Sequence, residues 1–101
     1  MHSRRLDFVA INAAALPCLS ALLHHWLPDG RTEGVEFVAR NPTRTDRRPG
    51  SFKVNLRTGR WADFATGDAG GDVVSLVAYL GGTGQTEAAR NLADMVRVRH
   101  D

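Results

Sequence analysis

Apolar and polar residues alternate in the middle of the chain, and apolar residues recur at helical spacing on either side of it. Ser51–Asn55 and Arg60–Phe64 alternate with a period of two, and Leu56–Gly59 between them is typical of a hairpin turn. Gly34–Arg40 alternates in the same way. The middle of the chain therefore predicts three short strands.

The residues before these strands predict two short helices. Asn12 suits the N-cap of an alanine-rich turn over residues 13–16, and Pro17 suits the first position of a second helix. Leucines at helical spacing continue this second helix until Pro28-Asp29-Gly30 ends it.

The residues after the strands predict two further helices. Asp72 suits the N-cap of the apolar run VVSLVAYL, and the glycine-rich stretch Gly81–Gly84 suits its end. A last helix is predicted from about Gln85 to Val98, with Ala88, Leu92, Met95 and Val96 on one side.

Together these elements predict an α+β fold, in which a three-stranded antiparallel sheet is flanked by N-terminal and C-terminal helices. At 101 residues the chain is expected to form a single domain, 1–101, with residues 1–6 flexible. No apolar run approaches the roughly 20 residues of a membrane span, and the N-terminus lacks the apolar core of a signal peptide. We therefore expect a cytoplasmic protein with no membrane partner.

Cysteine and histidine usage limits the chemistry that the chain can carry. Cys18 is the only cysteine, so an internal disulfide is excluded. His24 and His25 are adjacent, and neighbouring helical residues point about 100° apart, so this pair does not chelate a metal from one face.

Three acids that are close in sequence, Asp63, Asp68 and Asp72, would form a divalent-cation site only if they converged. Their spacing is not that of a calcium loop, and Asp68 and Asp72 suit a turn and a helix cap. A metal-dependent enzyme is therefore the weakest hypothesis. We expect no catalytic residue, no metal and no cofactor.

Positive charge is concentrated beside the predicted hairpin, where Asp46 is the only acid between Arg40 and Arg60. Arginine binds phosphate through its planar fork and stacks on bases, so a sheet with this charge and an exposed aromatic ring favours single-stranded nucleic acid. Alternation places Trp61 and Phe64 on opposite faces, so at most one of them is exposed. The residues predicted to bind nucleic acid are Arg44, Arg47, Arg48, Lys53, Arg57, Arg60 and Trp61, although Trp61 fits the core equally well.

The order of these landmarks resembles the zinc-binding domain of bacterial and phage DNA primases. In that family a Cys-Pro-x-His stretch precedes a Pro-Ser-Phe strand, a strand with an aromatic residue and Cys-x-x-Cys follows, and a Gly-Gly-Asp turn opens a helix. This chain reads NPTR at 41–44, PGSF at 49–52, WADFAT at 61–66 and GGD at 70–72. The resemblance covers nearly the whole chain, with all four metal positions replaced.

The positions that match the family's zinc ligands are Asn41, Arg44, Asp63 and Thr66. Zinc requires several thiolate or imidazole donors at once, and a guanidinium has no lone pair to donate, so a metal-free and otherwise zinc-ribbon-like domain is expected. A salt bridge between Arg44 and Asp63 would replace the metal, with Asn41 and Thr66 hydrogen-bonded around it. The alternative is that these are unrelated loop residues.

The resemblance implies a role in DNA replication, because the family's domain contacts single-stranded template DNA while catalysis takes place in a separate domain. We expect a non-catalytic, degenerate zinc-finger domain that binds single-stranded DNA in a phage, a plasmid or another mobile genetic element. Sequence preference should be slight, since phosphate contacts and stacking do not read base edges. The alternative is a protein-interaction module that docks on a primase, helicase or polymerase encoded nearby.

Overall fold

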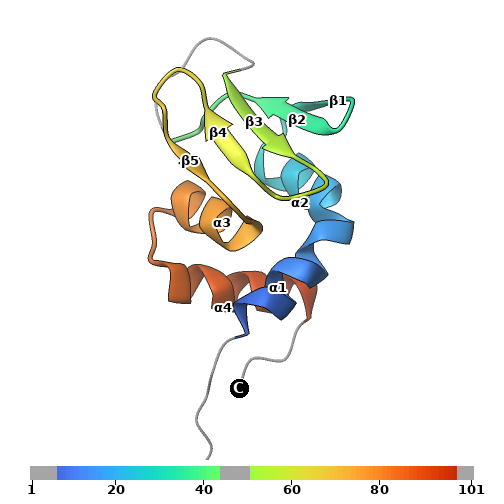
Figure 1. The fold of residues 1–101 in the computed structure, drawn as a ribbon, viewed down its shortest axis with the longest axis vertical. Coiled ribbons are helices and arrows are strands. Elements are labelled where there is room, and N and C mark those ends of the chain that lie inside the picture. The colour runs from blue at the N-terminus through green and yellow to red at the C-terminus, as the bar shows by residue number, and fades with distance from the viewer. Residues whose placement is uncertain (1–6, 44–50, 98–101) are drawn as a thin grey trace, which may run out of the picture.

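The computed structural model describes residues 7–43 and 51–97, which form an α+β fold with the sheet at one end and helix α4 at the other (Figure 1). The first helical segment consists of α1 (Phe8–Ala15), the 3-10 turn η1 (Leu16–Cys18) and α2 (Leu19–Trp26). The predicted fold class is confirmed. Residues 1–6, for which flexibility was predicted, lie outside the described part of the chain.

A single apolar stripe determines how this first segment packs. Its buried residues recur every fourth position, which places them on one face: Ile11, Ala15, Leu19, Leu23 and Leu27. With 19 residues, Phe8–Trp26 is also long and apolar enough to cross a membrane by length and composition alone. A segment of that length was not predicted from the sequence, because Pro17 suggested a break between two helices. The core helix of a soluble protein and an N-terminal signal sequence can have the same length and apolar composition.

The sheet contains five antiparallel strands in the order of the chain, so the prediction of three strands is wrong. The strands are β1 (Arg31–Glu33), β2 (Glu36–Ala39), β3 (Phe52–Asn55), β4 (Trp61–Asp63) and β5 (Ala69–Gly70). The three middle strands match the predicted ones. The edge strands were missed because β1 is short, polar and exposed, and β5 has only two residues. Neither carries an apolar alternation.

One face of the sheet packs against the helices. Its core-facing residues lie opposite one another in the ladders: Phe37 with Val54, Val54 with Trp61, and Ala39 with Phe52. All five are buried. The opposite face has no helix among the described elements (Figure 1). It therefore leaves side chains of β2, β3 and β4 accessible.

Helix α3 (Val73–Gly81) begins and ends as the sequence predicts. The Asp72 carboxylate accepts a hydrogen bond from the Ser75 backbone N–H at 2.8 Å. Gly82 ends the helix in the left-handed conformation, with φ of 64°, which a glycine adopts without steric cost. Both predicted caps are confirmed.

Helix α4 (Gln85–Val96) packs against α3 and α1, with Ala88 and Leu92 buried as predicted. Met95, which was predicted to lie on the same side, is 48% exposed. It lies at a groove between α3 and the end of α2, where the described elements leave it uncovered.

The cap of the first helix also differs from the prediction. Asp7, and not Asn12, caps α1, and its carboxylate accepts from the Ala10 N–H at 3.0 Å. Pro17 lies in η1, the 3-10 turn between α1 and α2, so the second helix begins two residues later than predicted, at Leu19. Asn12 lies inside α1, and its side-chain oxygen accepts from the Val74 N–H at 2.9 Å. It thereby caps α3 from a distant part of the chain.

Candidate nucleic-acid interface

The open face of the sheet presents its side chains in rows that cross the strands. In one row Glu36 lies opposite Asn55, whose N–H donates to the Arg60 carbonyl at 2.7 Å. The next row contains Val38, Lys53, Ala62 and Ala69. Phe64 lies beyond that row, and its N–H donates to the Ser51 carbonyl at 2.8 Å. Neighbouring rows are two residues apart, a distance of about 6.6 Å.

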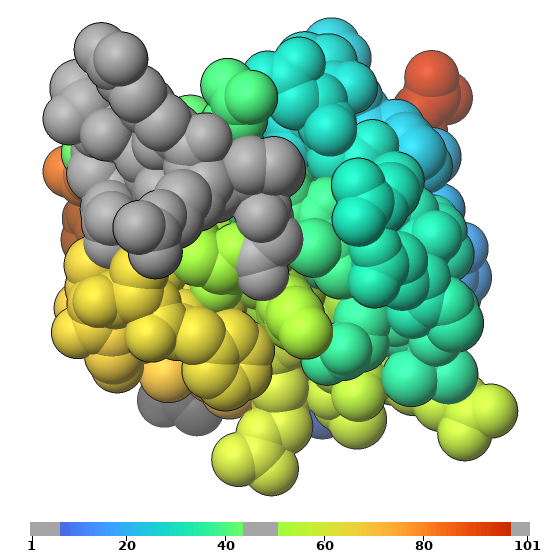
Figure 2. Space-filling model, turned by 90° about the horizontal axis from the view of Figure 1, so that it is seen from above, coloured from blue at the N-terminus to red at the C-terminus, as the bar shows by residue number. Residues whose placement is uncertain are grey.

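An open groove of about 340 Å³ lies over these rows. The residues that line it come from β2, β3, β4 and β5 and from the segments beside them: Glu36, Lys53, Asn55, Arg60, Trp61, Ala62, Phe64, Ala69 and Gly70. In Figure 2 the lime-green residues of β3 lie between the yellow segment of β4 and the teal segment of β1 and β2. The groove is large enough for a small flat ligand.

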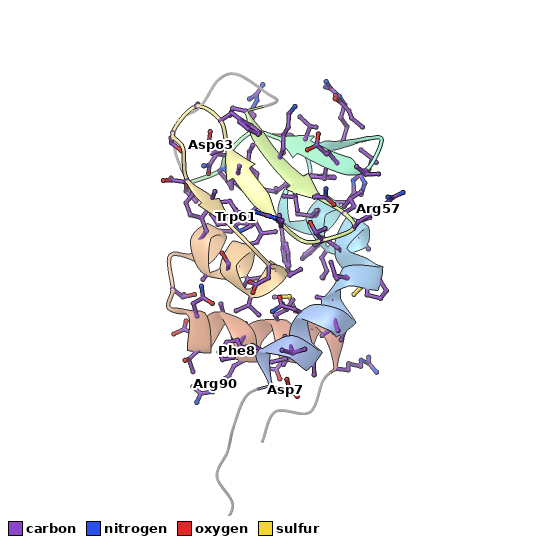
Figure 3. The ribbon with its side chains drawn as sticks, viewed as in Figure 1. Asp7, Phe8, Arg57, Trp61, Asp63 and Arg90 are labelled. Atoms are coloured by element: carbon purple, nitrogen blue, oxygen red, sulfur yellow. The ribbon has the colours of Figure 1, made fainter. Side chains whose placement is uncertain are left out.

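The two aromatic residues of the hairpin have opposite environments, as alternation predicts. Phe64 is 71% exposed, whereas Trp61 is 5% exposed. Trp61 lies beneath the sheet, where its ring N–H donates to Ser75 Oγ at 3.1 Å and its ring centroid is 4.5 Å from that of Tyr79 (Figure 3). The prediction of Trp61 as the stacking residue is therefore wrong, because its faces are occupied in the core. The exposed ring is Phe64.

The structure brings together only part of the predicted basic group. Lys53 Nζ is 5.7 Å from the centroid of the Phe64 ring, a cation–π geometry, and Arg60 lines the same groove. Arg57 lies apart from the groove at the tip of the β3–β4 hairpin (Figure 3). Arg44, Arg47 and Arg48 lie outside the described residues.

Two of the four positions that match the family's zinc ligands meet in a buried corner. Asn41 and Asp63 are 1% and 0% exposed, and Asn41 Nδ2 donates to Asp63 Oδ2 at 2.7 Å. Asp63 Oδ1 also accepts from the Ala65 N–H at 2.8 Å. Thr66 is exposed, and its hydroxyl accepts from the Asp68 N–H at 3.2 Å. The predicted Arg44–Asp63 bridge involves a residue outside the described part of the chain.

Tyr79 of α3 completes this corner and was not predicted from the sequence. Its hydroxyl accepts from Asn41 Nδ2 at 2.7 Å and donates to Asp68 Oδ2 at 2.8 Å. Thr43 Oγ1 lies 3.4 Å from the same hydroxyl. The available signal was a tyrosine in a largely apolar helix, since a partly buried hydroxyl usually finds a partner. One hydroxyl thus joins α3 to the loops that follow β2 and β4.

The three acids of the metal hypothesis have separate roles. Asp63 belongs to the buried corner, Asp68 binds the Tyr79 hydroxyl, and Asp72 caps α3. Within residues 7–43 and 51–97 no group of three His, Cys, Asp or Glu side chains is placed to hold a metal ion.

The glycine-rich turn before α3 has a packing role at Gly70. A Cβ there would collide with Ser75 Oγ and with the Trp61 ring. The close approach of β5 to the core therefore requires glycine at this position.

The other candidate groups make ordinary structural contacts. The His24 ring meets the Phe37 ring edge to face, with centroids 5.0 Å apart. The Cys18 thiol donates to the Ala15 carbonyl at 3.4 Å, within the continuous helical segment. Neither arrangement indicates catalysis.

Comparison with protein-family models, with curated proteins and with solved structures gave no match for this chain.

Proposed function

We propose that the open face of the sheet binds single-stranded DNA. The observation that supports this proposal is the pairing of a largely exposed Phe64 ring with Lys53 Nζ at 5.7 Å, beside a groove that Arg60 also lines. A base stacks on an aromatic ring, while cations beside it neutralise the phosphates of the same strand.

The arrangement favours a single strand over a duplex. The described helices pack on the core-facing side of the sheet, so none stands on the open face to enter a major groove (Figure 1). A stacking ring also requires an unpaired base, which a duplex does not offer.

The biological setting follows from the primase resemblance and is part of the same proposal. The chain acts as a metal-free, non-catalytic, cytoplasmic domain in replication or priming in a phage, plasmid or other mobile element. Asn41 and Asp63, which match two ligand positions of that family, are joined by a direct hydrogen bond. That bond supports a degenerate domain that keeps this corner closed without zinc.

A titration with a fluorescent thymidine oligonucleotide tests the proposal. If about three to five phosphates are neutralised, log K falls against log salt with a slope of roughly −2 to −3.5. The joint replacement Arg47→Ala and Arg48→Ala flattens this slope, and a duplex of the same length binds more weakly. Absence of binding at low salt would contradict the proposal.

A protein-interaction function is the second candidate, and one feature favours it. A largely apolar groove of about 420 Å³ lies between α2, α3 and α4, and its lining includes Trp26, Val77, Leu80 and the exposed Met95. In this case the partner is a replication protein such as a primase, helicase or polymerase. Met95→Asp would then abolish retention of that protein in a pull-down while leaving oligonucleotide binding unchanged.

A further inference from the structure

We propose that the groove on the open face holds one nucleobase and that Glu36 selects guanine there. This inference rests on the proposed binding of single-stranded DNA and names the base that the site prefers. It concerns a single position in the bound strand, whereas stacking and phosphate contacts elsewhere are indifferent to sequence.

The position of Glu36 distinguishes it from the other acids of the sheet. It lies on the open face of β2, is half-buried, and lines the same groove as Lys53, Arg60 and Phe64. Glu33 on the adjacent strand forms an ion pair with Arg31 at 2.6 Å. Within residues 7–43 and 51–97 Glu36 forms no ion pair, although Lys53 and Arg60 line the same groove.

A carboxylate in a phosphate-binding groove is unfavourable unless it meets hydrogen-bond donors of the ligand. It repels phosphate oxygens, and it has acceptors only. The donors that a DNA strand offers are on its bases. Glu36 therefore makes binding of the strand depend on which base lies beside it.

Guanine fits this requirement best. Its N1–H and N2–H₂ donors lie side by side on the Watson–Crick edge and match the two oxygens of one carboxylate. Adenine and cytosine present one amino group each, and thymine presents one imino group. A charge-assisted pair of parallel hydrogen bonds is stronger and more selective than a single bond.

The rows of the sheet give the bound strand its arrangement. One base stacks on Phe64. The next lies over Ala62 and Ala69, whose small side chains leave room for it, with its edge towards Glu36. Lys53 lies in the row between Phe64 and Glu36, where it meets the connecting phosphate. Rows about 6.6 Å apart suit successive nucleotides of an extended strand.

The test is a competition among thymidine strands of about twelve nucleotides that differ only at one central base, within the site sizes known for single-strand platforms. The central base is thymine, cytosine, adenine, guanine or hypoxanthine, which lacks the N2 amino group. We expect guanine to bind about fivefold or more tighter than thymine, and hypoxanthine to lose most of this gain.

Glu36→Gln separates base selection from general affinity. The variant should reduce the guanine preference to less than about twofold, because the carboxamide has one acceptor oxygen in place of two. It should also bind the all-thymidine strand at least as tightly as the wild type, because a charge that repels phosphate is removed. Glu87→Gln, the same change on exposed α4, is the matched control and should keep the guanine preference.

Each outcome bears on one of the two proposals or on both. Equal affinity for all five central bases, or a guanine preference that survives Glu36→Gln, would overturn the role of Glu36. Either result would still agree with the proposed binding of single-stranded DNA. Failure of the wild-type protein to bind any of these strands at low salt would overturn both.

Discussion

The Asn41 side-chain amide donates a hydrogen bond to Asp63 across 2.7 Å, and this bond joins the loop after β2 to the end of β4, 22 residues away in the sequence. Both side chains are buried, and the Tyr79 hydroxyl binds the same amide nitrogen. A zinc ion at the matching positions would connect the same two segments. In this chain, hydrogen bonds among Asn41, Asp63 and Tyr79 connect them instead.

The first prediction is that the fold does not depend on metal. Asn41 is engaged as a hydrogen-bond donor and Thr66 lies on the surface, so neither is positioned as a zinc ligand. Thermal melts with EDTA and with added Zn²⁺ should superimpose, since a metal that binds only the native state would raise the midpoint. Stoichiometric zinc in the purified protein, lost together with the fold on chelation, would refute it.

The second prediction concerns the stability of the buried corner. Asn41→Ala and Asp63→Ala should each lower the free energy of unfolding by on the order of 1–3 kcal/mol, because each removes one hydrogen bond from a buried polar group. Urea unfolding of both variants and of the double mutant gives the coupling free energy. We expect a coupling above roughly 0.5 kcal/mol.

Two controls accompany this cycle. Thr66→Ala changes an exposed side chain of the same loop and should have little effect on stability. A second cycle between Arg44 and Asp63 tests the bridge predicted from the sequence, where a coupling near zero would mean that Arg44 contributes nothing to the corner. Additive effects of Asn41→Ala and Asp63→Ala would contradict the hydrogen-bond account.

The third prediction concerns the long-range cap of α3. Asn12→Ala removes the oxygen that accepts from the Val74 N–H at 2.9 Å, so it should destabilise the protein by about 0.5–2 kcal/mol. Asn91→Ala, an exposed asparagine on α4, is the matched control. Chemical denaturation that finds both variants equally stable would show that Asp72 suffices to cap α3.

The fourth prediction separates the two aromatic residues of the hairpin. Phe64→Ala should weaken oligonucleotide binding by about 1–3 kcal/mol at every salt concentration, because stacking is lost and phosphate contacts remain. The fold should be unaffected, since the ring is 71% exposed. Binding isotherms at several salt concentrations, with circular dichroism of the same samples, measure both effects.

Trp61→Ala is the comparison for this prediction. Trp61 is 5% exposed and contacts Tyr79, so truncation should cost about 3–5 kcal/mol of stability through loss of core packing. A Trp61 variant that stays folded and loses DNA binding, beside a Phe64 variant that binds normally, would reverse the assignment.

Local features of this fold could be predicted from the sequence because neighbouring residues decide them. Alternation over Ser51–Asn55 and Arg60–Phe64 predicted the hairpin, and Asp72 and Gly82 fixed the two ends of α3. Caps and turns depend on backbone groups within a few residues, so the chain itself carries the information. The same reasoning established that Trp61 and Phe64 face opposite sides, without saying which side is the core.

Only the tertiary structure decided how the distant parts of the chain meet. Pairing with β2 makes a strand of the polar residues of β1, whose own sequence shows no alternation. The helices cover the Trp61 side of the sheet, which leaves Phe64 and Glu36 on the open face. Asn12 caps α3, and Tyr79 joins Asn41 to Asp68, because packing brings them together. Such contacts depend on which surfaces are buried against each other. The pattern of neighbouring residues in the sequence does not predict which surfaces these are.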